Sequence, residues 1–200
     1  MPRLSGTEGY GKTADALVKR YDSLTFEHVH RSTLDLLPAP PARALDIGAG
    51  TGRDAAALAA RGYMVVAAEP TAEMRANGQH LHVGGAIEWI DDGLPDLATV
   101  RAKYVPFDLV MMTAVWMHLD AEQRARAMPA VAGLVKTGGI LTMSLRHGPV
   151  PEGRRMFDVS AAETSALAAW HGLETIHHTV RDAITKAIDV TWDILALRKL

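Results

Sequence analysis

The chain has 200 residues, of which 48% are hydrophobic and 22% are charged, a balance typical of a folded protein with a buried core. Its formal net charge is -2 and its basic residues are scattered, which argues against nucleic acid as a partner. It contains no cysteine, which excludes disulfides, thiolate metal sites and a cysteine nucleophile.

The N-terminal segment carries no pattern for export. Residues 1–24 mix glycine with charged residues and lack the apolar centre of a signal peptide. No stretch reaches the roughly 18 consecutive apolar residues that a membrane-spanning helix needs. We therefore expect a cytoplasmic protein without membrane contact.

Helical and strand patterns alternate along the chain. Apolar residues recur at helical spacing over 14–37, which predicts one or two helices before the proline-rich segment 38–41. The expected strands are 42–47, 63–68, 86–90, 107–113, 140–146, 173–181 and 191–200. The expected later helices are 54–61, 71–80 with Thr71 as N-cap, 121–134 and 161–171, with a turn at 136–139. This order predicts one α/β domain with a mostly parallel sheet and helices on both faces.

A glycine-rich turn after the first predicted strand is the most informative motif. Gly48, Gly50 and Gly52 let the backbone approach a ligand at the carboxyl end of the strand. A dinucleotide-binding turn has glycine where this sequence has Arg53, which disfavours a pyrophosphate and a nicotinamide-dependent oxidoreductase. Asp46, just before the turn, would repel a phosphate and attract an ammonium group.

Acidic residues follow the next two strands. Glu69 lies about 20 residues after the turn, a spacing at which a carboxylate accepts hydrogen bonds from both hydroxyls of a ribose. After the third strand, Asp91 and Asp92 are candidates to accept a hydrogen bond from an adenine amino group, with Trp89 or Ile90 packed on the ring. The pattern indicates a cofactor that contains a nucleoside.

Taken in order, these motifs resemble those of the class I S-adenosylmethionine-dependent methyltransferases. The resemblance rests on 45–52, Glu69, 91–92, 107–110 and 134–139. It implies a Rossmann-like doubly wound sheet of seven strands in the order 3-2-1-4-5-7-6, with strand 7 antiparallel. It also implies a cofactor-binding core over 42–146, with a helical lid over 1–41 and the acceptor side over 147–200.

By this resemblance the cofactor is S-adenosylmethionine. Its amino acid part would lie on the glycine turn, its ribose at Glu69 and its adenine at Asp91 or Asp92. The expected cofactor-binding residues are Asp46, Gly48, Ala49, Gly50, Gly52, Glu69, Pro70, Asp91, Asp92 and Thr113.

The segment 113–120, which follows the fourth strand, is expected to face the methyl acceptor. It does not match the Asn/Asp-Pro-Pro-Tyr turn of methyltransferases that act on nucleic acid bases or glutamine, so we expect a small-molecule acceptor. Trp116 is a candidate wall of the acceptor pocket. His118 is a candidate general base, or alternatively packs under the helix that starts near Asp120.

Arginines at the end of the fifth strand and in the loop that follows it suit an anionic acceptor. Arg146 is a candidate to bind a carboxylate or phosphate, the alternative being an ion pair with a neighbouring acidic residue. For Arg154 and Arg155 we favour solvated loop positions.

Three N-terminal residues are candidates to close over the cofactor or to belong to the core: Tyr10, Tyr21 and His30, with packing favoured for Tyr21. The histidine pairs 80/82 and 177/178 lack an obvious third ligand, so no metal is expected. The alternative function is a catalytically silent S-adenosylmethionine-binding regulatory or scaffold protein.

Overall fold

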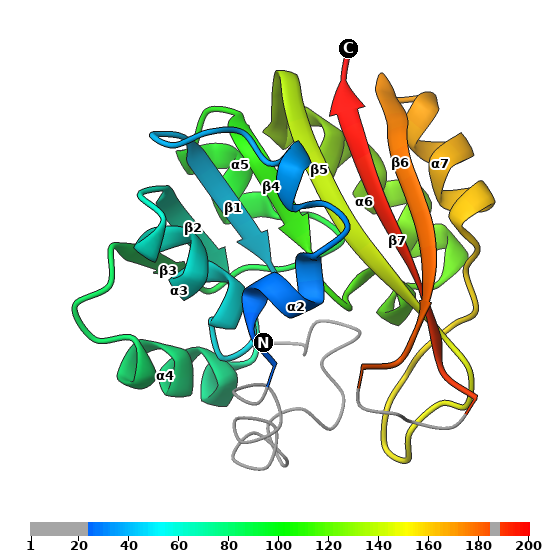
Figure 1. The fold of residues 1–200 in the computed structure, drawn as a ribbon, viewed down its shortest axis with the longest axis horizontal. Coiled ribbons are helices and arrows are strands. Elements are labelled where there is room, and N and C mark those ends of the chain that lie inside the picture. The colour runs from blue at the N-terminus through cyan, green and yellow to red at the C-terminus, as the bar shows by residue number, and fades with distance from the viewer. Residues whose placement is uncertain (1–23, 185–188) are drawn as a thin grey trace.

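A seven-stranded sheet runs through the centre of the computed structural model, which describes residues 24–184 and 189–200. Its strands are β1 (Arg43–Ile47), β2 (Met64–Ala68), β3 (Ile87–Ile90), β4 (Phe107–Met112), β5 (Val135–His147), β6 (Leu173–Asp182) and β7 (Thr191–Lys199). Their order is β3-β2-β1-β4-β5-β7-β6 (Figure 1). β7 pairs antiparallel with both β5 and β6, while the other pairs are parallel. The predicted strand order and direction are confirmed.

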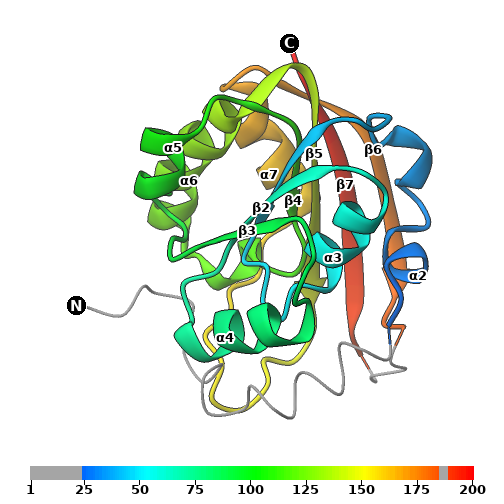
Figure 2. The same cartoon turned by 90° about the vertical axis from the view of Figure 1, so that its left-hand side faces the viewer.

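Helices cover both faces of the sheet, as Figure 2 shows edge-on. One face carries α2 (Phe26–His30), the 3₁₀ turn η2 (Leu34–Leu36) and α3 (Arg53–Ala60). The other carries α5 (Ala98–Lys103), the 3₁₀ turn η3 (Trp116–His118), α6 (Ala121–Leu134) and α7 (Ala161–Ala169). The remaining helix, α4 (Ala72–Leu81), lies near the carboxyl ends of β1, β2 and β3 (Figure 1).

The buried apolar residues form two clusters, one on each face of the sheet, because successive side chains of a strand point to opposite faces. In β1, Leu45 and Ile47 pack toward α5 and α6, whereas Ala44 packs toward α2 and α3. β4 divides in the same way. The central strands are therefore buried on both faces, which explains their nearly continuous apolar sequences.

Local capping explains where two of the helices begin. The Asp120 carboxylate accepts the Gln123 amide, and the Gln123 side chain accepts the Asp120 amide, which is a capping box for α6. The Ser160 hydroxyl accepts the Glu163 amide at the start of α7. Thr71 stands at the N-cap of α4 as expected, but its side chain makes no capping hydrogen bond there.

Two local predictions need correction, and a third is tested only in part. The turn at 136–139 lies within β5, where the pairing with β4 jumps from Val135 to Ile140 and leaves the intervening residues as an irregularity. The helix α5 was not predicted, since six residues are too few to show a clear helical period. Ahead of β1, the described chain has only the short α2 and η2, while Tyr10 and Tyr21 lie outside the described residues.

Candidate functional site

The turn from β1 to α3 is built from glycines in the left-handed region of the backbone. Gly50 has a φ of +59°, which an L side chain rarely adopts. Among the described residues, a Cβ on Gly50 would meet only the Met74 side chain, at 3.5 Å, so no other described atom fills this part of the turn. At Gly48 and Gly52, by contrast, a Cβ would lie 2.6 Å from Val115 and 2.7 Å from Trp89. The turn leaves room for a ligand above Gly50 and is closely packed at the other two glycines.

Glu69, at the end of β2, is bonded directly to this turn. Its Oε2 accepts the Gly50 amide at 2.8 Å and its Oε1 accepts the Thr71 amide at 2.7 Å. Burial raises the pKa of Glu69, although both amide donors act in the opposite direction. Each carboxylate oxygen has a second lone pair, so the side chain still has acceptor capacity for two hydroxyl groups. Pro70 and Ala49 flank the contact and are partly buried.

Asp46 lies beneath the turn and is 2% exposed. Its Oδ2 atom has no hydrogen-bond partner among the described residues. Burial and then the nearby Asp54 carboxylate raise the pKa of Asp46 well above its usual value. An unpaired buried carboxyl oxygen beside an open glycine turn fits a ligand with a positively charged donor, such as the ammonium group of S-adenosylmethionine.

The two aspartates after β3 have different surroundings. Asp92 is buried, and its carboxylate accepts the Gly93 amide at 2.8 Å and the Val100 amide at 2.9 Å, which ties it to α5. Asp91 is exposed and pairs with Arg75 at 2.9 Å. The adenine role stays a prediction for both, and the accessible carboxylate of Asp91 is the better placed of the two.

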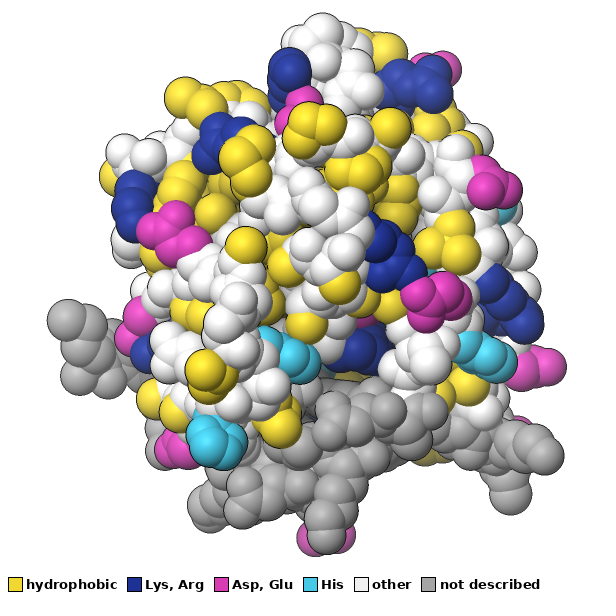
Figure 3. Space-filling view, turned by 60° about the vertical axis from the view of Figure 1, so that its left-hand side comes forward, with side chains coloured by type: hydrophobic (Ala, Val, Ile, Leu, Met, Phe, Trp, Pro, Cys, Tyr) yellow, Lys and Arg dark blue, Asp and Glu magenta, His cyan; other side chains and the backbone are white. Residues whose placement is uncertain are grey.

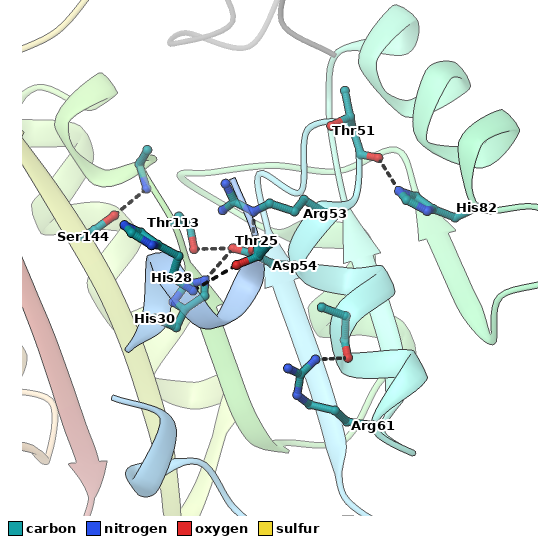
Figure 4. Close-up of polar contacts among 12 residues, drawn as sticks. Thr25, His28, His30, Thr51, Arg53, Asp54, Arg61, His82, Thr113 and Ser144 are labelled. Carbon is teal, nitrogen blue, oxygen red and sulfur yellow. Dashed lines mark hydrogen bonds and ion pairs between the residues drawn. The ribbon is translucent and has the colours of Figure 1, made fainter. Parts of the chain in front are cut away.

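A buried polar network joins α2, α3 and β4 (Figure 4). The Asp54 carboxylate contacts His30 Nε2 at 3.0 Å and accepts hydrogen bonds from Arg53 Nε and Thr113 Oγ1, both at 2.7 Å. The sequence analysis gave Thr113 as a cofactor-binding candidate and His30 as a residue that closes over the cofactor or belongs to the core. It gave no signal for Asp54 as their common partner, because this residue looks like an ordinary first-turn acidic residue of α3.

A small pocket opens beside this network, on the face of the sheet that carries α2. The described residues that line it are Val29, His30, Thr33, Thr113, Thr142, Met143, Ser144 and Ile194. Ala114, the next residue after Thr113 in the sequence, has a φ of +60°. Its amide donates a hydrogen bond to Ser144 Oγ at 2.9 Å (Figure 4). A non-glycine residue in this strained conformation next to a pocket is typical of functional sites.

The two residues expected to face the acceptor after β4 lie deeper than predicted. Trp116 is fully buried in the core beneath α6, and its place in the acceptor pocket stays a prediction. His118 is 6% exposed, and its Nδ1 lies 2.8 Å from the Arg155 carbonyl oxygen. A carbonyl only accepts, so this contact places the proton of the neutral ring on Nδ1, and the role of His118 stays a prediction.

Arg146 near the end of β5 and Arg155 in the loop that follows have different environments. The Arg155 guanidinium contacts Asp120 at 2.7 Å and Gln123 at 3.1 Å, so it fastens the loop to the start of α6. Arg146 is half-buried and contacts the Gly148 carbonyl at 3.4 Å. Its role toward an anion stays a prediction.

Within residues 24–184 and 189–200, no three histidine or acidic side chains come together to form a candidate metal site. Of the helices in these ranges, none has both the length and the apolar character needed to cross a membrane.

A seven-stranded sheet in this order, with a glycine turn after β1 and an acidic residue after β2, defines a Rossmann-like domain. Residues 44–139 match the family described as a methyltransferase domain. This stretch of the chain is similar to that family, and the strand order is the one that the resemblance to the class I S-adenosylmethionine-dependent methyltransferases implies.

Known relatives are consistent with this assignment. Uncharacterized methyltransferases of Mycobacterium tuberculosis and Mycobacterium bovis are 34% identical over 113 residues. That region is 53% of this chain and 40% of each relative, so the similarity spans well under half the length of these proteins.

Solved structures share the fold at low sequence identity. A TehB-like S-adenosylmethionine-dependent methyltransferase from Corynebacterium glutamicum has a TM-score of 0.70 and 16% identity, covering 94% of this chain and 99% of that one. The 1,6-didemethyltoxoflavin-N1-methyltransferase of Burkholderia thailandensis, bound to its substrate and S-adenosylhomocysteine, has a TM-score of 0.68 and 19% identity, covering 94% and 87%. These likenesses establish the shared fold.

Proposed function

We propose that this chain transfers a methyl group from S-adenosylmethionine to a small-molecule acceptor. The observation that carries the proposal is the cradle formed by Asp46, Gly50 and Glu69, in which an unpaired buried carboxyl oxygen lies beside an open glycine turn. The methyltransferase domain match supports the same reaction, as does the neighbour that binds S-adenosylhomocysteine.

The side chains and backbone of this cradle have distinct tasks in the proposal. Asp46 neutralises the ammonium group, Glu69 accepts from the ribose hydroxyls, and Asp91 accepts from the adenine amino group. The backbone of the turn passes beneath the amino acid part, and Thr113 marks the reacting end. When bound, the cofactor supplies an electrophilic methyl group on a sulfonium.

We further propose that the acceptor carries an anionic group. Arg181 on β6 is half-buried, and no described residue bonds to its Nε atom, which is itself buried. Burial, and then the positive charges of Arg31 and Arg53, lower the pKa of Arg181. Strand register places Arg146 two strands away from Arg181, with Trp192 between them. The positive charges of Arg31 and Arg53 repel that of Arg181, and a bound carboxylate or phosphate would offset this repulsion.

A small acceptor also agrees with the surface. Among the described residues on the face shown in Figure 3, Lys and Arg side chains are interspersed with Asp and Glu and form no continuous basic stripe. Phosphate backbones are bound by such stripes, so this face favours a small anion over a nucleic acid.

The test begins with calorimetric titration of S-adenosylmethionine and S-adenosylhomocysteine into the full chain. Methyl-labelled cofactor is then incubated with pooled small carboxylates and phosphates and, as a matched control, with their neutral methyl esters. We expect saturable cofactor binding and label transfer to members of the anionic pool. Transfer to the esters alone would contradict the anionic acceptor, and tight binding without any transfer would favour a silent cofactor-binding protein.

A further inference from the structure

His30 is held by Asp54 in an arrangement suited to proton transfer. The imidazole is 6% exposed and the carboxylate residue is 4% exposed, with Nε2 and Oδ2 at 3.0 Å. Burial raises the pKa of Asp54, but the charges and hydrogen bonds of His30 and Arg53 outweigh it and bring the pKa well below its usual range. Asp54 is therefore ionised and acts only as an acceptor.

This contact determines which nitrogen of His30 carries the proton in the neutral ring. Because the Asp54 carboxylate accepts, Nε2 is the donor, and Nδ1 bears the lone pair. No residue in the described ranges donates a hydrogen bond to Nδ1. His30 is also one of the residues that line the small pocket, together with Thr113 and Ser144. His30, whose orientation Asp54 fixes through Nε2, thus belongs to the wall of this pocket.

His118, the histidine that the sequence favoured, lacks this arrangement. Its Nδ1 is committed to the Arg155 carbonyl, and it does not line the pocket. The two histidines also lie on opposite faces of the sheet, His30 with α2 and His118 with the turn under α6.

We propose that His30 is the general base for the methyl acceptor and that Asp54 is the residue that positions it, an inference that rests on the proposed methyl transfer. The acceptor's O–H or N–H bond breaks as its electron pair forms the bond to the methyl carbon. The sulfonium C–S bond breaks with its pair returning to sulfur, and the proton ends on His30 Nδ1. The imidazolium that forms is stabilised by the ionised Asp54, and its proton passes afterwards to solvent.

Bromoacetate provides a test that needs no knowledge of the acceptor. This anionic reagent transfers a carboxymethyl group to an unprotonated imidazole nitrogen with loss of bromide, and the chain has no cysteine to compete. We expect mass spectrometry to find His30 modified at least about tenfold faster by bromoacetate than by neutral bromoacetamide, because nearby arginines concentrate anions. His80, which is exposed, is the internal reference and should show no such preference. Equal rates at His30 and His80 with both reagents would overturn the inference.

The role of Asp54 is tested by the tautomer of His30. In the ¹⁵N-histidine-labelled wild-type protein, NMR under conditions in which the imidazole is neutral should show His30 protonated at Nε2 with a lone pair on Nδ1. In Asp54→Asn this preference should weaken and carboxymethylation of His30 should slow, whereas Asp108→Asn, at a carboxylate bonded to Arg43 and Lys136, should change neither. A proton on Nδ1 in the wild type would overturn the inference even if the Asp54 variant fails to fold.

Calorimetry with S-adenosylhomocysteine separates this inference from the proposed function. Cofactor binding together with an unreactive His30 would refute the base and leave the methyltransferase proposal intact. A reactive, correctly protonated His30 in a protein that binds no cofactor would refute the proposed function, and with it the assignment of His30 to methyl transfer.

Discussion

Glu69 Oε2 accepts the backbone amide of Gly50 at 2.8 Å, which links the end of β2 to the turn after β1. The residue expected to bind the ribose and the turn expected to bind the amino acid part therefore form one unit. Replacing either member should affect the same ligand.

Glu69→Ala is expected to weaken S-adenosylhomocysteine binding by about 1–3 kcal/mol, because the ribose hydroxyls lose their acceptors. Calorimetric titration of the folded variant measures the change. An unaltered affinity would show that the ribose is bound elsewhere.

Gly50→Val should abolish cofactor binding, since a branched side chain would fill the open space above the turn and strain a backbone with a φ of +59°. Gly84→Val is the matched control, because Gly84 has a φ of +82° and also faces open space, after α4. The control should lose stability from the same strain and bind the cofactor normally. Equal loss of binding in both variants would mean that strain, not the site, explains the effect.

Asp46→Asn should stabilise the ligand-free protein increasingly as the pH rises. Because burial and Asp54 raise the pKa of folded Asp46, the wild type loses stability from pH about 4 up to that raised pKa, and the variant lacks this loss. The Tm difference between variant and wild type should therefore be larger at pH 8 than at pH 4, while S-adenosylhomocysteine binding weakens.

For Asp108→Asn, the Tm difference between variant and wild type should change with pH in the opposite direction. The Arg43 amide and Lys136 lower the pKa of Asp108, so its contribution to stability is present at neutral pH and fades as the pH falls through the usual range of aspartate. If both variants changed Tm in the same direction with pH, the account of Asp46 would be incorrect.

Gly78→Ala in α4 should destabilise the protein by about 1–3 kcal/mol, although alanine is the better helix former. A Cβ there would collide with the Trp89 ring and lie 3.0 Å from the Thr51 carbonyl oxygen. The Cβ of Gly133→Ala in α6 would meet no atom of the residues that the structure describes within 4 Å, and this variant should gain up to about 1 kcal/mol of stability. Urea unfolding of the two variants measures the difference, and a gain in both would refute the packing argument.

The order of the strands was predictable because each strand has an apolar sequence of the right length and the motifs between them follow a known order. The pair Gly50 and Glu69 was predictable for the same reason, since both stand at the carboxyl ends of adjacent strands. Helix α5 was not, because it is short and follows Leu97, a buried residue with a φ of +46°.

The polar contacts of the site could not be predicted from the sequence. His30 and Asp54 are 24 positions apart, and nothing in the spacing of either residue indicates that they meet. From the sequence, Asp92 was a candidate to bind a ligand, yet its carboxylate oxygens accept hydrogen bonds from the Gly93 and Val100 amides. Contacts of this kind depend on how loops fold back onto the sheet, which no local pattern records.

The most direct test of the central claim is calorimetric titration of S-adenosylhomocysteine into the purified full chain, with NAD as the control ligand. We predict saturable binding of the adenosyl compound at about micromolar concentration and none of NAD. Folded protein that binds NAD, or that binds neither ligand, would contradict the assignment of a methyltransferase cofactor to this site.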